Sequence, residues 1–583
     1  KKDYQILRHG LSDDLLNDIH AYCRKQKTHP SIVYRLIASL MIKQYCRPDS
    51  DFVLWDIQSG RAAGYEQEIG VFYQQVPYLI SSGLLSRGCT AGGFYTQQRQ
   101  YRREIKNHTM LSLSTLNALF PTGTINFQYN YFNFLQPVSM DGSSSLPDTF
   151  SSHVDGTVQI FVKDYGDSVD FELWFDGSVF TPLDFLPRMD QVTRQLIANP
   201  QLDLSNVQYE LPHEMAARKE WNDQPRVLTH DGIIDWFTES VRKHSEQSAL
   251  ICGDLILSYG QLDSISNRLA NHLSQQGVEQ YDRVGVFLSR SQWSLISILA
   301  VVKLGAVYVP IEAAYPKDRV QYILADSGAR TLVTESCLQA KAEGFEGNVV
   351  SVDCLDAVLT SVQDDPQSVT ISRHDPIYAI YTSGSTGKPK GALVTHGGEV
   401  NLQTWYTEQS DFKVGDKSLI ISAFGFDLTQ KNLFGPLLCG GAVVIPVMNQ
   451  FDFDVVALEI EKHGITHINC APSALYSIVE GCDHNRAAKL KSLRWVFLGG
   501  EPIRLDALQQ WLQSSDTSAQ IVNSYGPTEC TDVVSFHVIR NVASENTLIP
   551  IGKPIYNTQI HIVDDNLLPV AMGAIGEIVI AGA

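Results

Sequence analysis

The segment from residue 381 to 391, YTSGSTGKPKG, has the residue types of a phosphate-binding loop. It begins at the end of the apolar run IYAIY, and its small residues leave backbone N–H groups free to bind phosphate oxygens. Lys388 and Lys390 add positive charges that suit a polyphosphate. Pro389 follows Lys388 where a P-loop has Ser or Thr, so the segment is not a P-loop. A Ser/Gly-rich loop without a ligand is the alternative interpretation. The residues expected around the phosphates are Thr382, Ser383, Gly384, Ser385, Thr386 and Gly387.

The elements around this loop alternate between apolar, strand-like runs and amphipathic, helix-like segments. The alternation begins near His230 and includes VGVFL, AVYVPI, THINCA and WVFLGG as expected strands. Such alternation predicts an α/β fold with largely parallel sheets covered by helices on both faces. Ligands of these folds bind at the carboxyl ends of the strands. We expect the main sheets over 230–550 and a small β-rich piece over 551–583.

Several further segments occur in an order that resembles the adenylate-forming (ANL) superfamily. They are LSYGQLD (257–263), KLGAVYVPIEAAYP (303–316), FGFDLTQKNLFGPLLCGGAVVI (424–445), FLGGEPI (497–503), NSYGPTE (523–529) and IGKPIYNTQIHIVDDNLLPVAMGAIGEI (551–578). The resemblance covers about 230 to 583. It implies a core of two parallel-type β-sheets flanked by helices, an activity that uses ATP and Mg²⁺, and phosphate binding by the loop at 381–391.

The resemblance also assigns roles to individual residues. It gives catalytic roles to Thr382, Lys390, Thr528 and Glu529, with Thr528 near the α-phosphate and Glu529 as the Mg²⁺ ligand. Tyr525 would stack on adenine. The other residues that it places at the nucleotide are Gly500, Glu501, Pro502, Asn523 and Ser524.

Within the superfamily, the chain is most similar to the amino-acid adenylation domains of nonribosomal peptide synthetases. Asp427 in the FGFD segment could pair with the α-ammonium group of an amino acid, a charge that a fatty acid lacks. The sequence Trp221-Asn222-Asp223 resembles the junction that follows a condensation domain. Taken alone, Asp427 is also a good helix N-cap before LTQKNLF.

The family's amino-acid pocket can be transferred position by position, and it is unusually polar in this chain. Its residues are Asp427, Leu428, Lys431, Asn469, Phe497, Gly499, Ser524, Asp532 and Val533. An apolar substrate would leave the polar groups without partners. If Lys431 faces the ligand, a Glu- or Gln-like side chain is favoured, and this is the substrate class we expect. A cationic side chain suits the pocket if Asp532 alone faces the ligand. A neutral polar side chain suits it if Lys431 and Asp532 pair with each other.

Residues 1–215 resemble the C-terminal lobe of a condensation domain, a chloramphenicol-acetyltransferase-like α/β fold. The resemblance lies in SGRAAGYEQEIGVFYQQVPYLI and FELWFDGSVFTPLDFLPRM, and residues 216–229 are predicted to be a linker. The His-His-x-x-x-Asp-Gly signature of a working condensation domain does not occur in the sequence. Condensation activity therefore has no support from these residues.

Composition agrees with a cytoplasmic, globular protein. The chain has 583 residues and 44% hydrophobic residues, and its net charge of −19 disfavours nucleic acids and anionic membranes as partners. Its ten cysteines form no Cys-x-x-Cys pair, which argues against a zinc ribbon and a dense disulfide framework. No apolar stretch approaches the length of a membrane span, and the first residues do not resemble a signal peptide.

These observations predict an ATP-dependent, AMP-forming ligase that activates a polar amino acid. The resemblance implies transfer of the product to the phosphopantetheine thiol of a partner carrier domain, and other synthetase modules as further partners. The family's C-terminal subdomain has no counterpart in the sequence, so we expect a truncated adenylation core with impaired turnover. The alternatives are a related ligase that acts on another carboxylic acid, and an inactive scaffold remnant.

Overall fold

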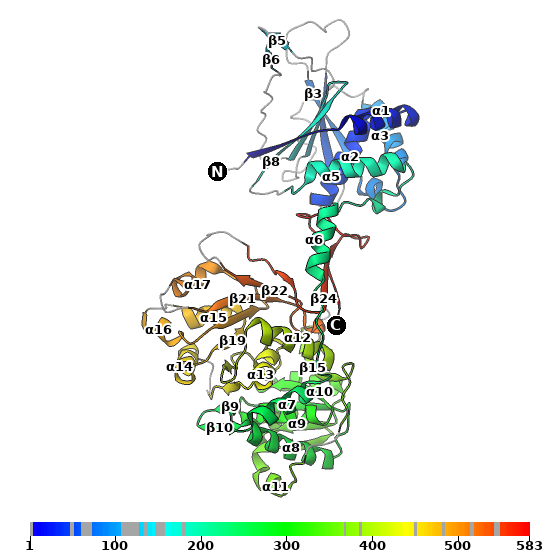
Figure 1. Cartoon of the computed structure of the whole chain (residues 1–583). Coiled ribbons are helices and arrows are strands. Elements are labelled where there is room, and N and C mark those ends of the chain that lie inside the picture. The colour runs from blue at the N-terminus through cyan, green and yellow to red at the C-terminus, as the bar shows by residue number, and fades with distance from the viewer. Residues whose placement is uncertain are drawn as a thin grey trace. The chain divides into compact units, whose positions relative to one another are not determined.

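The described residues of the chain divide into two compact units. The computed structural model describes residues 4–46, 52–59, 73–105, 127–132, 138–140, 143–145, 158–177, 182–365, 369–383, 387–447, 452–480, 484–513, 518–540 and 548–582. Unit 1 consists of Lys1–Lys219 and His561–Val579, and unit 2 of Glu220–Ile560 and Ile580–Ala583. Each unit is described below by itself (Figure 1).

Unit 1 contains a mixed sheet with the strand order β1-β8-β7-β4-β2-β3. The strands are β1 (Tyr4–Gly10), β8 (Val169–Asp176), β7 (Val158–Asp164), β4 (Phe127–Phe132), β2 (Phe52–Ser59) and β3 (Tyr73–Ile80). The inner pairs β7·β4 and β4·β2 are parallel, and the outer pairs are antiparallel. The short strands β5 (Val138–Met140) and β6 (Ser143–Ser145) pair with each other.

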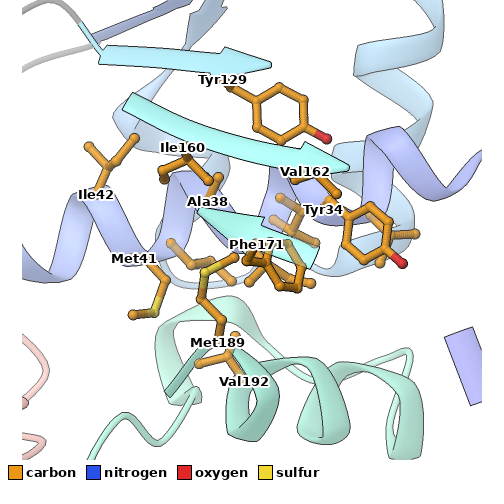
Figure 2. Close-up of a cluster of buried hydrophobic side chains, with 14 of the residues drawn as sticks. Tyr34, Ala38, Met41, Ile42, Tyr129, Ile160, Val162, Phe171, Met189 and Val192 are labelled. Carbon is orange, nitrogen blue, oxygen red and sulfur yellow. The ribbon is translucent and has the colours of Figure 1, made fainter. Parts of the chain in front are cut away.

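Helices pack on the sheet of unit 1 and close its hydrophobic core. They are α1 (Asp13–Gln26), α2 (Pro30–Cys46), α3 (Ala91–Ile105) and α5 (Phe185–Ala198). Helix α2 carries the run IVYRLIASLMI, which is apolar on nearly every side, so it is expected in the interior. Figure 2 shows Met41 and Ile42 of α2 beside Ile160 of β7 and Met189 of α5, and all four side chains are buried.

The segment predicted to be a linker folds partly as helix α6, Pro212–Asn222. Proline suits the first turn of a helix because its missing N–H has no intrahelical partner there. Glu214 on this helix is buried and receives two hydrogen bonds from Arg188, each 2.7 Å long. It also accepts a hydrogen bond of 3.1 Å from the backbone N–H of Met572. Glu214 therefore anchors both α6 and the segment 561–579 to unit 1, whereas the sequence predicted 551–583 to be one β-rich piece.

Replacing Glu214 with glutamine is expected to destabilise unit 1 by about 2 kcal/mol, because an amide cannot accept two charge-assisted hydrogen bonds from a buried guanidinium. Urea unfolding of the chain, with limited proteolysis near α6, measures the effect. Exposed Glu220→Gln on the same helix is the control and is expected to change stability little. Equal stability of the Glu214→Gln variant and the wild-type chain would contradict this role.

The larger sheet of unit 2 has the strand order β10-β9-β18-β17-β19-β20-β21-β22-β23. The strands are β9 (Ser248–Cys252), β10 (Leu255–Ser258), β17 (Lys417–Leu419), β18 (Ala442–Ile445), β19 (His467–Cys470), β20 (Trp495–Gly499), β21 (Gln520–Tyr525), β22 (Ser535–Ile539) and β23 (Lys553–Pro554). All pairs from β9 to β21 are parallel. Pairs at both edges are antiparallel.

The other sheet of unit 2 has the strand order β14-β13-β11-β12-β15-β16. The strands are β11 (Arg283–Leu288), β12 (Val307–Glu312), β13 (Thr331–Thr334), β14 (Asn348–Ser351), β15 (Pro376–Thr382) and β16 (Lys390–Thr395). Among these strand pairs, the β15·β16 hairpin at the edge of the sheet is antiparallel and the others are parallel. Two further strands, β24 (Thr558–Val563) and β25 (Glu577–Gly582), pair with each other.

Helices alternate with these strands along the chain, as the sequence predicts (Figure 1). They are α7 (Ile233–His244), α8 (Tyr259–Gln275), α9 (Gln292–Lys303), α10 (Lys317–Ser327), α11 (Asp356–Ser361), α12 (His396–Gln409), α13 (Leu428–Leu438), α14 (Phe453–His463), α15 (Pro472–Val479), α16 (His484–Lys489) and α17 (Leu505–Leu512). The predicted α/β fold is confirmed, and its sheets are mixed because antiparallel strands occupy their edges. Within the described part of the chain, no helix has both the length and the apolar character needed to cross a bilayer.

Candidate functional site

The predicted phosphate loop connects the two strands of the β15·β16 hairpin. Thr382 at the end of β15 lies opposite Lys390 at the start of β16 in the strand register. Gly387 and Lys388 are exposed, and Gly387 has φ of 82°, which favours glycine. Three of the predicted loop residues lie outside the described residues, namely Gly384, Ser385 and Thr386. The described part of the loop is therefore an exposed turn held at both ends by paired strands.

The other predicted nucleotide residues gather where β20 and β21 end, because parallel neighbours place their carboxyl ends at the same edge. Asn523 on β21 donates a hydrogen bond of 2.8 Å to the backbone oxygen of Pro550, and Ser524 donates one of 2.9 Å to that of Leu498. The next residue, Tyr525, is 38% exposed, so its ring is accessible at the strand end.

The turn after β20 holds the predicted residues Gly500, Glu501 and Pro502, all of which are exposed. Gly500 has φ of 83°, which favours glycine at this position. Glu501 accepts hydrogen bonds from the backbone N–H and the hydroxyl of Ser473, at 3.1 and 3.0 Å. The Glu501 carboxylate thus joins this turn to the first turn of α15.

Glu529 and Thr528 lie in the short 3₁₀ helix η5 (Thr528–Cys530), which follows β21. Strand β16, with Lys390, contacts this helix. The Glu529 carboxylate is exposed, and a carboxylate oxygen fits Mg²⁺, which binds one or two carboxylates together with substrate phosphates. The residues at this edge therefore fit a metal–nucleotide complex in charge and ligand type.

Asp427 is the N-cap of α13, as one interpretation of the sequence predicted, and it is only half-buried. Its Oδ1 accepts a hydrogen bond of 2.8 Å from the backbone N–H of Leu428. Its Oδ2 accepts a hydrogen bond from the hydroxyl of Thr528. A carboxylate can accept about four hydrogen bonds, so capping the helix leaves Asp427 able to bind a further cation. The structure thus joins the candidate amino-acid position to the candidate phosphate position.

Lys431 and Asp532 form a buried ion pair behind Asp427. The Lys431 side chain has no exposed surface, and that of Asp532 is 8% exposed. Thr531 and Asp532 have φ values of 62° and 65°, in the left-handed region that residues other than glycine rarely adopt. The backbone that positions the Asp532 side chain is therefore strained. This pairing is the third case that the sequence left open, and the positive charge of Lys431 is already compensated within the protein.

The remaining pocket residues come from the strand ends and from Val533. Asn469 on β19 donates a hydrogen bond to the backbone oxygen of Leu428, and its buried Oδ1 has no hydrogen-bond partner among the described residues. Phe497 on β20 is fully buried, and its ring centroid lies 4.9 Å from that of Tyr406 on α12. A Cβ atom at Gly499 would lie 3.0 Å from the Ser524 hydroxyl, so a larger residue would crowd this wall. Val533 is buried beside the ion pair.

Glu399 on α12 is a buried carboxyl group that was not predicted from the sequence. Glu399 accepts a hydrogen bond of 2.7 Å from Gln403 and one of 3.4 Å from the hydroxyl of Tyr378. Gln403 also donates one of 3.2 Å to the backbone oxygen of Gln430 on α13. Glu399 and Gln403 are four residues apart on this helix, and the spacing of the two polar side chains was the available signal in the sequence.

Burial changes the acidity of the two carboxyl groups in this region. Desolvation raises the pKa of Glu399 to about 7, and the hydrogen bond from Gln403 lowers it only in part. Desolvation also raises the pKa of Asp532 to about 6, against the opposing effect of Lys431. Both values exceed the usual range of carboxyl groups. The region therefore becomes more negative as the pH rises from about 5 to about 8.

The raised pKa of Glu399 predicts a loss of stability at higher pH. A carboxyl group whose folded-state pKa exceeds its ordinary value near 4.5 stabilises the fold below that value, and the stability is lost as the pH rises through about 7. We expect Glu399 to account for about 3 kcal/mol of decrease between pH 4.5 and pH 8.

Urea unfolding of the wild-type chain and the Glu399→Gln variant across this pH range measures the decrease. The variant should show a clearly smaller slope with pH, the remaining slope coming from groups such as Asp532. Exposed Glu461→Gln on α14 is the control and should keep the wild-type slope. Identical slopes for Glu399→Gln and wild type would contradict the raised pKa.

Comparisons with known proteins show which proteins the chain resembles. A linear gramicidin synthase polypeptide of Brevibacillus parabrevis is 29% identical over 539 residues, which are 90% of this chain and 7% of that protein. A plipastatin synthase polypeptide of Bacillus subtilis (strain 168) is 27% identical over 591 residues, which are 98% of this chain and 22% of that protein. The chain therefore spans less than a quarter of the length of these relatives.

A solved structure gives the same fold at low sequence identity. The nonribosomal peptide synthetase FmoA3 (S1046A), in its alpha-methyl-L-serine-AMP bound form, matches with a TM-score of 0.85 and 21% identity. The match covers 100% of this chain and 66% of that chain. The sequence profile described as AMP-binding enzyme matches residues 237–583, more than half of the chain. The chain with this site at its strand ends therefore belongs to the AMP-binding enzyme family.

Proposed function

We propose that the chain is the adenylation core of a nonribosomal peptide synthetase module. In the proposed reaction, a carboxylate oxygen of an amino acid attacks the α-phosphorus of ATP, the bond to the β-phosphate oxygen breaks, and aminoacyl-AMP and pyrophosphate form. The enzyme is then an ATP-dependent, AMP-forming ligase. Mg²⁺, held by Glu529 and the phosphates, would neutralise developing negative charge when bound.

The observation that carries the proposal is the hydrogen bond between Thr528 and Asp427. It joins Thr528, the candidate contact of the α-phosphate, to Asp427, whose carboxylate is suited to bind an α-ammonium group. In an amino acid the ammonium and carboxylate groups are one carbon atom apart. A ligand bound at Asp427 could therefore direct its carboxylate toward a phosphate near Thr528. This positioning supports activation by proximity rather than by a covalent protein nucleophile.

We propose a neutral polar side chain for the substrate. Pairing between Lys431 and Asp532 leaves neither charge free to balance a charged side chain, which removes the reason to expect glutamate. The unpaired Oδ1 of Asn469 favours a donor such as the side-chain amide of glutamine. Of the expected Glu/Gln-like class, glutamine is therefore the better candidate.

The proposed function also includes a role for unit 1 and for partner domains. Unit 1 is proposed to be the C-terminal lobe of a condensation domain. The product is proposed to pass to a phosphopantetheine thiol on a carrier domain, within a larger assembly of synthetase modules. The long relative that matches across 98% of this chain supports a multidomain context.

Amino-acid-dependent exchange between ATP and labelled pyrophosphate tests the proposed function across the proteinogenic amino acids, ornithine and citrulline. Exchange should be fastest with a neutral polar amino acid, because the buried pair leaves no charge free for a charged side chain. Exchange with an acid that lacks an amine would favour a related ligase instead. If calorimetry detects no binding of ATP with Mg²⁺, the chain is a scaffold and the proposal fails.

A further inference from the structure

Three carboxyl groups and one ammonium group lie in the same region of unit 2, and all of them except Asp427 are buried. The backbone beside Glu399 packs against the residue before Asp532, since a Cβ atom at Gly398 would lie 2.6 Å from the Thr531 hydroxyl oxygen. Glu399 interacts electrostatically with both Asp532 and Lys431, and Asp532 interacts with Asp427 and Lys431. Lys431 is paired with Asp532, and Asp427 is the proposed partner of the substrate ammonium group. Among the described residues Glu399 forms no ion pair, and Lys431, which attracts it, is already paired with Asp532.

Glu399 is held firmly in this region by neutral partners. Gln403 bridges it to the backbone oxygen of Gln430, the residue before Lys431 on α13. Gln430 in turn accepts a hydrogen bond from the hydroxyl of Tyr308. Glu399 and Gln430 have no exposed surface, so water does not screen the charge of the carboxylate. Its position relative to Lys431 is fixed through these contacts.

We infer that Glu399 is a specificity-determining residue that makes the amino-acid pocket reject side chains bearing a carboxylate; this inference rests on the proposed function. A substrate carboxylate would add a further negative charge to a region that already has more acids than bases. Lys431 could compensate it only by leaving Asp532 uncompensated and buried, which is costly. A neutral side chain of the same shape adds no negative charge and does not draw Lys431 away from Asp532. Glutamine is therefore accepted and glutamate is not.

Other titratable groups face Glu399 and must be separated from it in a test. They are Asp532 after η5, Lys431 on α13, Tyr378 on β15 and Tyr308 on β12. Asp427 before α13 interacts with Asp532 and with Tyr378. Burial raises the pKa of both tyrosines well above their ordinary value, so they stay neutral at the pH of the test. Asp532 titrates lower than Glu399, so measurements from pH 6.5 to 8.5 follow mainly Glu399.

The test uses three nonreactive analogues of the proposed product, glutaminyl-, glutamyl- and ornithyl-sulfamoyl adenosine. They share the adenosine and α-amino groups and carry a neutral, a negative and a positive side chain. Calorimetry with the 583-residue chain gives the three dissociation constants from pH 6.5 to 8.5. The wild-type preference for glutaminyl over glutamyl analogue should rise about tenfold over this range as Glu399 ionises.

The Glu399→Gln variant should bind the glutamyl analogue about tenfold more tightly relative to the glutaminyl one, and its preference should no longer change with pH. Glu399→Asp should retain a pH-dependent preference, and Glu461→Gln should behave as wild type. A preference that is the same in wild type and Glu399→Gln at every pH overturns the inference but leaves the proposed function standing. Failure of all three analogues to bind the wild-type chain overturns both.

Discussion

Replacement of Asp427 by asparagine is expected to weaken binding of an aminoacyl-sulfamoyl adenosine by about a hundredfold, a change of about 3 kcal/mol. The amide oxygen can still accept the hydrogen bond from Leu428, and the amide NH2 group can donate one to the Thr528 hydroxyl, so the start of α13 and the contact with η5 should persist. What the variant loses is the negative charge that we propose compensates the α-ammonium group. The variant is therefore expected to lose binding energy at the α-ammonium group alone.

An analogue without the amine separates this effect from damage to the fold. Binding of the corresponding deamino-acyl-sulfamoyl adenosine should be nearly equal in wild type and Asp427→Asn. Asp452 provides a matched control, because it also caps a helix, α14, but is exposed. Asp452→Asn should bind both analogues as wild type does. An equal loss of affinity for the amino and deamino analogues in Asp427→Asn would show that Asp427 serves only as a helix cap.

Replacing Lys431 with methionine is expected to destabilise unit 2 by about 3 to 5 kcal/mol. The change removes the cation of a buried pair and leaves the buried carboxylate of Asp532 without compensation. Asp532 should then take up a proton, so the destabilisation should become smaller as the pH is lowered. The direction follows from desolvation, which already raises the pKa of Asp532 to about 6 in the intact pair.

Urea unfolding at pH 8 and pH 5 measures the destabilisation and its pH dependence. The double variant Lys431→Met with Asp532→Asn should regain much of the lost stability, because it removes both charges together. Lys413→Met is the control, since Lys413 pairs with Asp411 on the surface, where both side chains are more than 60% exposed. A Lys431→Met variant as stable as the Lys413→Met control would contradict a compensated buried pair.

The fold of unit 2 was largely predictable from the sequence, because its signals are local. Strand-like runs such as THINCA and WVFLGG became β19 and β20, and the strand at IYAIYT became β15 before the phosphate loop. The strands of a parallel sheet are buried on both faces, so they are near-continuous hydrophobic runs that can be recognised in the sequence. The antiparallel strands toward the sheet edges, such as β16 and β22, were harder to predict. Where such a strand pairs depends on which strand of the sheet is left with an unpaired side.

The grouping of the segment 561–579 with unit 1 could not be predicted from the sequence. Its alternating apolar residues predict strands, and β24 and β25 are present. Its grouping with unit 1, however, depends on contacts made by Met572 and by the buried Ala571 with residues hundreds of positions earlier in the chain. Nothing in the local pattern encodes these partners.

The sequence by itself determined the family, the strand-end location of the site and the residue types that surround it, because motif order and hydrophobic periodicity are properties of short segments. Only the tertiary structure decided how the charges are used. It paired Lys431 with Asp532, joined Asp427 to Thr528, and buried Glu399 beside them. The physical reason is that the energy of a charge depends on its burial and on its nearest opposite charge, and both are set by residues far apart in the chain.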